Sequence, residues 1–288
     1  MVYRRLSKPI IPGRDHKDPV ECNISGTQFS MKVMPSSSGF DNRSGDVKQL
    51  DLSDLAQFRG PQDDTERQFP RKARLFGRSP YAFAGFLDSK LLGTTGMGGS
   101  VYTFPTMPAT ISLFHPPYLE QALINFIYHH YGPGNLRLRK GYYQCARHWR
   151  TVKIGGNNWI FLDAFETQFS LDDQGSSSET APSKIYSYWH PISHSKVLRI
   201  HMVNSGWHPY GPCVEYFDEI QKECMQTVSL SLSESALADR EEAKARFGNV
   251  GYSKELAIPD WEFPLVTVDH MGRATIEIPG SPVPEWNE

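Results

Sequence analysis

The sequence predicts an α+β fold in which helices pack on a mainly antiparallel sheet. Three observations predict it: an amphipathic helix in the middle of the chain, strand-like runs separated by short turns, and a late hairpin. Strands joined by short turns pair in antiparallel fashion. If helices cover both faces, the same order predicts an α/β/α sandwich. A doubly wound parallel sheet is disfavoured because strands and helices do not alternate regularly.

The chain is long enough for one large domain. Of its 288 residues, 39% are hydrophobic, which suffices for a sizeable core without disulfides or metals. Residues 1–20 are polar and basic, and we expect a loosely held arm there. Residues 21–288 are predicted to form a single α+β domain. Its core is expected at about residues 100–230, and residues from about 35 to 100 are expected to be an insertion.

The first third of the chain predicts few regular elements. Alternating apolar residues predict one or two strands between Cys22 and Met34. Apolar residues between 50 and 58 predict one short helix, capped by Ser53 or Asp51. The glycine-rich segment 93–100 is expected to be a flexible loop that leads into a strand.

The middle of the chain contains the clearest helix. From Tyr118 to Tyr131, apolar residues recur at the i, i+3, i+4 and i+7 spacing of a helix that covers a sheet. Gly132-Pro133-Gly134 is expected to end this helix. Apolar and aromatic runs predict strands around it, at residues 111–114, 136–139, 142–153 and 159–165.

The second half of the chain predicts strands, two helices and a hairpin. An apolar stripe indicates the first of these helices, whereas the second is rich in alanine and charge and ends before Gly248-Asn249. The expected elements are strands at 184–189 and 197–203, helices at 216–230 and from Ser233 or Ser235 to Phe247, and hairpin strands at 265–268 and 274–278.

Composition narrows the function classes. A net charge of −2 argues against a bulk nucleic-acid binder. No apolar segment follows the basic N-terminal residues, and no run approaches the ~20 apolar residues of a membrane span. The sequence therefore favours a soluble, cytoplasmic protein without a cofactor. The cysteines show neither CxxC nor zinc-ligand spacing and are expected to be buried and reduced; they are Cys22, Cys145, Cys213 and Cys224.

Glycines and histidines give no site signature. In the segment 93–100, Gly99 stands where a phosphate-binding loop needs its lysine. His190 and His194 lie four residues apart, but Pro191 argues against the helix that would bring them to one face. A metal site needs three or four convergent donors, and no histidine pair has ligand spacing.

Two further pairs are weighed and set aside. Cys145 and His148 lie three apart on a predicted strand, where alternation places them on opposite faces. Asp163 and Glu166 invite a nuclease interpretation through metal-bound carboxylates, yet the same alternation separates them. The sequence therefore predicts no catalytic residue and no metal site.

Residues 134–153 combine basic and aromatic side chains and contain no acid. Arginine, tyrosine and tryptophan dominate protein–protein hot spots, and the same mixture can stack on nucleic acid. A solvated strand face, a protein interface and a nucleic-acid surface all remain open. Under the interface interpretation, the candidate partner-binding residues are Arg137, Arg139, Tyr143 and Trp149.

Two segments are rich in acidic residues. Solvated surfaces explain them, but an inhibitor of a nuclease would also use such patches, because complementary charge speeds encounter with a basic active site. The candidate partner-binding acids are Asp51, Asp54, Asp63, Asp64 and Glu66 in the first segment, and Glu215, Asp218 and Glu219 in the second.

The segment Gly155–Phe165, together with Trp149, Trp159 and the helix–sheet core, resembles a known functional class. It is similar to the immunity proteins that accompany type VI-secreted nuclease toxins of the restriction-endonuclease-like class in bacterial competition. The similarity covers about residues 100–230, and the order of elements also resembles the small Mog1/PsbP-type sandwich. The resemblance implies a stoichiometric binder of a cognate toxin, with no reaction of its own and no membrane or direct nucleic-acid partner.

Two alternatives stay open beside the immunity interpretation. One is a hydrolase that uses a histidine–aspartate pair drawn from His201, His208 and Asp218, which requires those groups to meet in one pocket. The other is a scaffold or nucleic-acid-binding protein that acts through residues 134–153.

Overall fold

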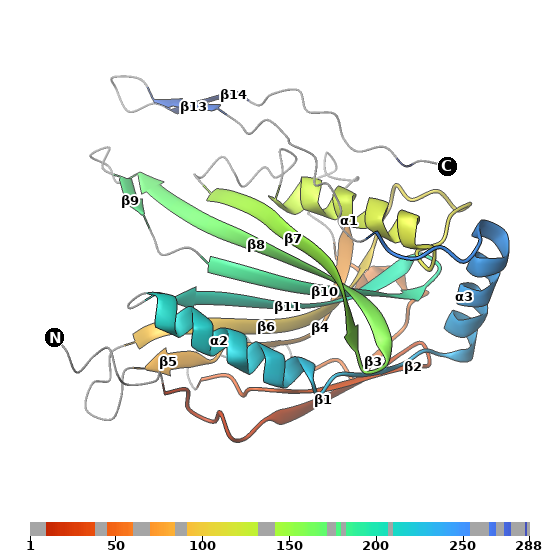
Figure 1. Ribbon diagram of the computed structural model, residues 1–288, viewed down its shortest axis with the longest axis horizontal. Coiled ribbons are helices and arrows are strands. Elements are labelled where there is room, and N and C mark those ends of the chain that lie inside the picture. Colours follow the sequence, from red (N-terminus) through yellow and green to blue (C-terminus); the bar gives the residue numbers. More distant parts are fainter. Residues whose placement is uncertain are drawn as a thin grey trace.

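The computed structural model confirms an α+β fold with a mostly antiparallel sheet and helices packed on it (Figure 1). No helix in the described part of the chain is long and apolar enough to cross a membrane. The structure describes residues 10–37, 45–59, 70–83, 91–131, 142–171, 177–179, 183–206, 210–253, 265–268, 274–277 and 286.

One eight-stranded sheet forms the centre of the molecule. Its strands are β4 (Arg71–Arg78), β5 (Tyr81–Phe83), β6 (Leu91–Thr103), β7 (Tyr142–Ile154), β8 (Asn157–Leu171), β9 (Ser177–Glu179), β10 (Ser183–Ser193) and β11 (Lys196–Gly206). The main order is β4-β6-β11-β10-β8-β7, and β5 and β9 add to β6 and β8. All of these strands pair antiparallel. The strands expected at 142–153, 159–165, 184–189 and 197–203 are confirmed, and each extends further than its sequence pattern indicates.

The expectation of a flexible loop at residues 93–100 is wrong, because this segment lies inside β6. Its glycines leave room for large side chains on the two neighbouring strands of the same sheet. A Cβ on Gly99 would overlap the ring of Phe76, its cross-strand neighbour on β4, and one on Gly98 would lie 2.6 Å from Cε1 of His201, its cross-strand neighbour on β11. Glycine in a strand often marks such a close approach. Strands β4 and β6, which lie within the expected insertion at about residues 35–100, are part of the main sheet.

Helix α1 (Pro116–Tyr131) covers one face of the sheet and confirms the central predicted helix. Its apolar stripe is fully buried against strands β6, β7, β8, β10 and β11. Trp189 lies at the centre of this core, 0% exposed, with its ring centroid 4.6 Å from that of Phe126. The helical residues in the core are Leu119, Ala122, Leu123, Phe126 and Ile127.

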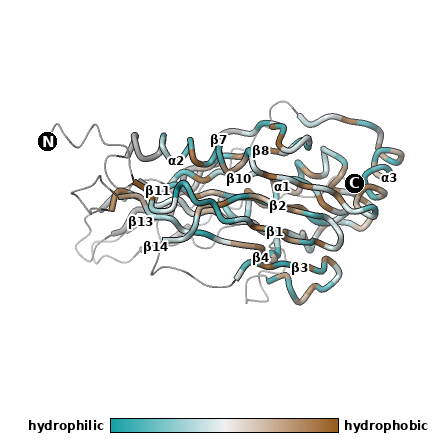
Figure 2. The backbone as a smooth tube through the Cα atoms, turned by 90° about the horizontal axis from the view of Figure 1, so that it is seen from below, coloured by the Kyte–Doolittle hydropathy of each residue, from teal (hydrophilic) through white to brown (hydrophobic). Residues whose placement is uncertain are grey.

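The opposite face is covered by helix α2 (Tyr210–Met225) and a four-stranded sheet. The order of that sheet is β12-β2-β1-β3, formed by Ser229–Ser231, Thr27–Val33, Asp18–Ile24 and Gln49–Leu50. Figure 2 views the molecule from the side of β1 and β2, whose hydrophobic and hydrophilic positions alternate. Two strands between residues 22 and 34 were expected, and both form.

The predicted helix at 216–230 is correct in its middle and wrong at its end. The helix stops at Met225, and Leu230 belongs to β12, opposite Phe29 of β2. Thr227 connects the end of α2 to β2. Its hydroxyl donates to the carbonyl of Cys224 (2.7 Å) and accepts from the backbone amide of Lys32 (2.8 Å). A β-branched residue that hydrogen-bonds the backbone in this way favours a helix end.

Helix α3 (Glu234–Phe247) has the ends that the sequence predicts. The Ser233 hydroxyl accepts from the amide of Ala236 at 3.2 Å, and Gly248 follows the last residue with a φ of 86°. Figure 1 shows α3 at one end of the strands of the large sheet. The predicted hairpin is also confirmed, as β13 (Leu265–Val268) paired with β14 (Ala274–Glu277).

Three smaller expectations have different outcomes. Residues 111–114 form turns rather than a strand, with the Leu113 amide donating to the His194 carbonyl. The short helix near residue 55 is a 3₁₀ turn, η2 (Leu55–Gln57), capped by Asp54 instead of Ser53 or Asp51. The predicted strand at 136–139 lies outside the described residues.

Buried histidines are expected to make stability depend on pH. Burial lowers the pKa values of His129 and His190 to about 4, and that of His201 well below its usual value. Between pH 6.5 and 4 the unfolded chain therefore binds more protons than the folded chain, so stability falls as pH falls. Relative to pH 7, we expect the free energy of unfolding at pH 5 to be lower by about 2 kcal/mol for each of His129 and His190, measured by urea unfolding.

A matched pair of variants checks this assignment. His129→Gln/His190→Gln should flatten the dependence of the unfolding free energy on pH between 7 and 5. His16→Gln, at an exposed position, should leave it unchanged. Equal slopes in both variants would contradict the prediction.

Candidate protein-binding surface

Helix α2 presents the second acidic segment on its outer face. Phe217, Ile220 and Cys224 are 0% exposed and face the core. Glu215 and Glu219 are exposed on the other side, one turn apart. Among the described residues, neither glutamate has an ion-pair partner. These two carboxylates are the part of the predicted acidic patch that is available to a partner.

Asp218, the third predicted acid of α2, is engaged within the protein. Its Oδ1 accepts from the hydroxyl of Tyr186 (2.6 Å) and from the side-chain Nδ2 of Asn204 (3.5 Å). Its Oδ2 accepts from Lys184 Nζ (3.2 Å). Burial and the hydrogen bond to Asp218 raise the pKa of the Tyr186 phenol. Asp218 therefore fastens α2 to β10 and β11.

Removing the Tyr186 hydroxyl tests this fastening. Tyr186→Phe is expected to lower the free energy of unfolding by about 1–2 kcal/mol, because a half-buried carboxylate loses a short hydrogen bond. Tyr118→Phe is the matched control. The Tyr118 ring packs on His115 and Phe247, and phenylalanine keeps these ring contacts. Chemical denaturation of both variants gives the comparison; equal losses would show that the bond to Asp218 contributes nothing.

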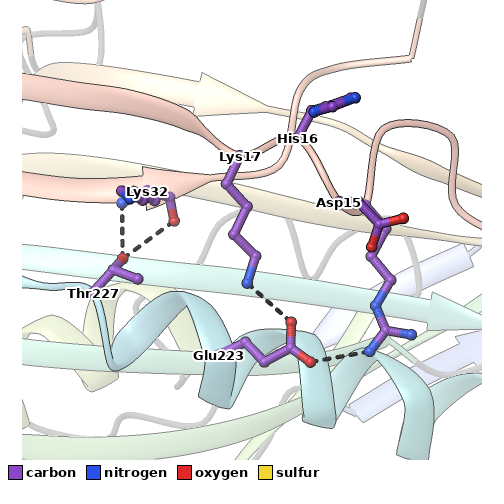
Figure 3. Close-up of a pocket in the computed structure, with 7 residues that line it drawn as sticks. Asp15, His16, Lys17, Lys32, Glu223 and Thr227 are labelled. Atoms are coloured by element: carbon purple, nitrogen blue, oxygen red, sulfur yellow. Dashed lines mark hydrogen bonds and ion pairs between the residues drawn. The ribbon is translucent and has the colours of Figure 1, made fainter.

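The last turn of α2 holds the N-terminal segment (Figure 3). Glu223 accepts from Lys17 Nζ at 2.9 Å and from the Arg14 guanidinium at 3.0 Å. The hydrogen bond from Lys17 has the largest effect in lowering the pKa of the Glu223 carboxyl, and the hydrogen bond from Arg14 lowers it further. Arg14 also donates to the hydroxyl of Tyr216 (2.6 Å) and stacks over its ring.

Figure 3 shows an open depression beside these ion pairs, lined by residues from the N-terminal segment, β2 and α2. Ile11 is 4% exposed, and Asp18–Val20 already belong to β1. Residues 10–20 are therefore held against the domain, which corrects the expected loose arm for this part. Residues 1–9 lie outside the described residues.

The first acidic segment serves local turns where the structure describes it. Asp51 is exposed, and its Oδ1 accepts from the amide and hydroxyl of Ser53. Asp54 is also exposed and caps η2 by accepting from the amide of Ala56 at 3.0 Å. Asp63, Asp64 and Glu66 lie outside the described residues.

The basic and aromatic stretch contributes less surface than expected. Trp149 is 7% exposed and packs in the core beneath α1, so its ring is not offered to a partner. The sequence could not reveal this, because an aromatic residue on a strand suits an interface and a core equally. Arg137 and Arg139 lie outside the described residues, and Tyr143 is described only as a backbone position in β7, opposite Thr167.

Of the groups weighed for hydrolysis, the two that the structure describes, His201 and Asp218, do not meet. His201 shares the face of β11 that carries Arg199 and packs under α1, whereas Asp218 lies on α2 across the sheet. His208 lies outside the described residues. The described residues contain no group of three or more His, Cys, Asp or Glu that could hold a metal ion.

Strand β7 also departs from simple alternation. Its register against β8 shifts between Ala146 and His148. A bulge of this kind inserts one extra residue and re-aims those that follow.

Sequence reasoning missed the part that Arg14 and Lys17 take in this surface. They lie 209 and 206 residues from Glu223, and no local pattern links positions so far apart. The acidic stripe of α2 was the one usable signal. No protein-family model matches this sequence, and no curated protein is significantly similar to it.

Proposed function

We propose that this chain is an immunity protein that binds and neutralises a cognate secreted toxin, a nuclease, in the cytoplasm of the producing cell. The observation that carries the proposal is the exposed carboxylate pair Glu215 and Glu219 on α2. A nuclease presents a basic surface to its substrate, and complementary charge gives an inhibitor both specificity and a fast encounter.

The energetics of the pair support this proposal. Like charges at i and i+4 on a helix repel and destabilise it by a few tenths of a kcal/mol. Neighbouring acids are neutralised, Asp218 by Lys184 and Glu223 by Arg14 and Lys17, but the outer pair is not. A basic partner would relieve this repulsion. The helix that presents the pair is rigidly fixed by Phe217 and Ile220 beneath it.

Charge reversal at the pair is expected to weaken toxin binding. Glu215→Lys/Glu219→Lys should weaken the affinity for the toxin encoded beside its gene by at least about tenfold, mostly through slower association at low salt. Glu242→Lys makes a similar change at an exposed site on α3 and should leave affinity unchanged. Surface plasmon resonance at two ionic strengths separates the rates.

Survival of toxin-expressing cells tests the proposal directly. Co-expression of the unmodified chain should restore growth and co-purify the toxin in a fixed stoichiometry, and the double variant should protect less. Growth of toxin-expressing cells without this chain would reject the proposal, as would turnover of a substrate by the isolated chain.

A further inference from the structure

A cleft of about 270 Å³ lies at the end of the molecule where α3 meets the large sheet. Helix α3, the turn between β7 and β8, the end of β10 and the segment after α3 surround it. Arg240 and Lys244 contribute cationic groups, and none of the described lining residues carries a carboxylate.

His190 gives this cleft a buried polar group. The residue is 7% exposed and lines the cleft, and its ring centroid lies 5.1 Å from that of Trp159, with the two rings tilted by 51°. Its Nδ1 is buried and makes no hydrogen bond of standard geometry among the described residues, and the Pro191 backbone is the polar group next to the ring. A buried ring nitrogen without a partner costs stability, which a ligand in the cleft can recover.

The two cations keep a net positive charge at the mouth of the cleft. Both contact the same carboxylate, Glu241, with Lys244 Nζ at 2.7 Å and Arg240 Nε at 3.4 Å from Oε1. The Glu241 side chain is 60% exposed, and such surface ion pairs contribute little. Reorienting Arg240 and Lys244 towards an anion therefore costs little.

A second depression continues the cleft along β7. It shares Asn158 and Tyr252 with the first, adds Arg150, and again has no carboxylate among its described lining residues. The wall formed by the segment after α3 is fixed, because Glu120 of α1 accepts from the amide (2.7 Å) and the hydroxyl (2.8 Å) of Ser253. The positive charge thus lines a shaped groove.

We propose that this cleft binds a small anion that carries a phosphate or carboxylate group. Arg240 and Lys244 bind its oxygens, and Nδ1 of His190 makes a third polar contact at the buried end. Arginine matches the paired oxygens of both anions, and lysine adds a point charge. The site is independent of toxin binding through α2.

The test uses the full chain and two probes. Inorganic phosphate and malonate are titrated separately at constant ionic strength in chloride, by calorimetry and by tryptophan fluorescence, since Trp159 lies beside His190. Saturable binding of either probe is expected, and the stronger of the two identifies the anion class. Arg240→Gln/Lys244→Gln should weaken it by about tenfold or more.

Arg246→Gln removes a positive charge from the same helix at a position that does not line the cleft, and should bind as the unmodified chain does. Circular dichroism confirms folding of each variant. The ¹⁵N resonance of His190 Nδ1 in the unmodified chain provides a readout without mutation, and should shift on titration. A response that does not saturate, equal weakening by Arg246→Gln, or an unshifted His190 resonance would overturn the site.

Discussion

Trp189→Ala is expected to lower the free energy of unfolding by about 3–5 kcal/mol, the usual range for removing a large buried aromatic side chain. Trp189 is 0% exposed, and its ring lies 5.4 Å from that of Tyr102 and 4.6 Å from that of Phe126. The Arg199 guanidinium stacks over it at 5.1 Å. Strands β6 and β11 and helix α1 hold these neighbours in place, so the cavity cannot collapse. Urea unfolding measures the loss.

Trp286→Ala is the matched control for this change. Trp286 is half-buried, donates from Nε1 to the Thr106 hydroxyl at 3.2 Å, and contacts Phe104 at its edge. We expect a loss of about 1 kcal/mol or less, because one hydrogen bond and little apolar area are removed. A loss for Trp189→Ala no larger than this would show that α1 packs less tightly on the sheet than the structure indicates.

Gly99→Ala is expected to destabilise the protein by about 1–3 kcal/mol, although it adds a single methyl group. The new Cβ would overlap Cε1 of Phe76 and lie 2.7 Å from Cδ1. Phe76 is 1% exposed and stacks on Phe29 of β2, so its ring cannot turn away. Thermal and chemical denaturation should both report the loss.

Gly96→Ala supplies the comparison within the same strand. There the new Cβ would meet Val203 Cβ at 3.8 Å, an ordinary contact, so stability should change little or rise slightly. Gly99→Ala/Phe76→Leu should recover part of the loss by reducing the ring to a smaller side chain. Similar behaviour of Gly96→Ala and Gly99→Ala would contradict the packing argument.

The elements that sequence predicted best are those whose signals are local. Helix α1 follows from a continuous apolar stripe, and the ends of α3 follow from Ser233 and Gly248 at its two caps. The late hairpin follows from alternation on both sides of a short turn. In each case, the residues that determine the element lie within it or directly beside it, so the element can be predicted from a short stretch of sequence.

The failures concern contacts between distant segments. Gly98 and Gly99 indicate flexibility when read alone. Only their cross-strand neighbours, His201 on β11 and Phe76 on β4, reveal that large side chains lie against them. Helix α2 ends early because Thr227 bonds to Lys32, 195 residues away. No window of sequence contains such pairs.

The candidate surface was predictable in part. The acidic stripe of α2 indicated Glu215 and Glu219, which the structure leaves exposed. It could not separate them from Asp218, because the position of Tyr186 depends on how β10 pairs. Trp149 was predicted at a partner surface but lies in the core. The position of α1 decides which face of β7 is buried, and the sequence of β7 does not contain that information.

The four-stranded sheet has a consequence for synthesis of the protein. Strands β1 and β2 emerge first, but β12, which borders β2, follows after 195 further residues from Lys32 to Thr227. At roughly 5–20 residues per second, the ribosome needs on the order of 10–40 s to deliver it. During that interval one edge of the first hairpin is open, and folding of this layer finishes only when most of the chain has been translated.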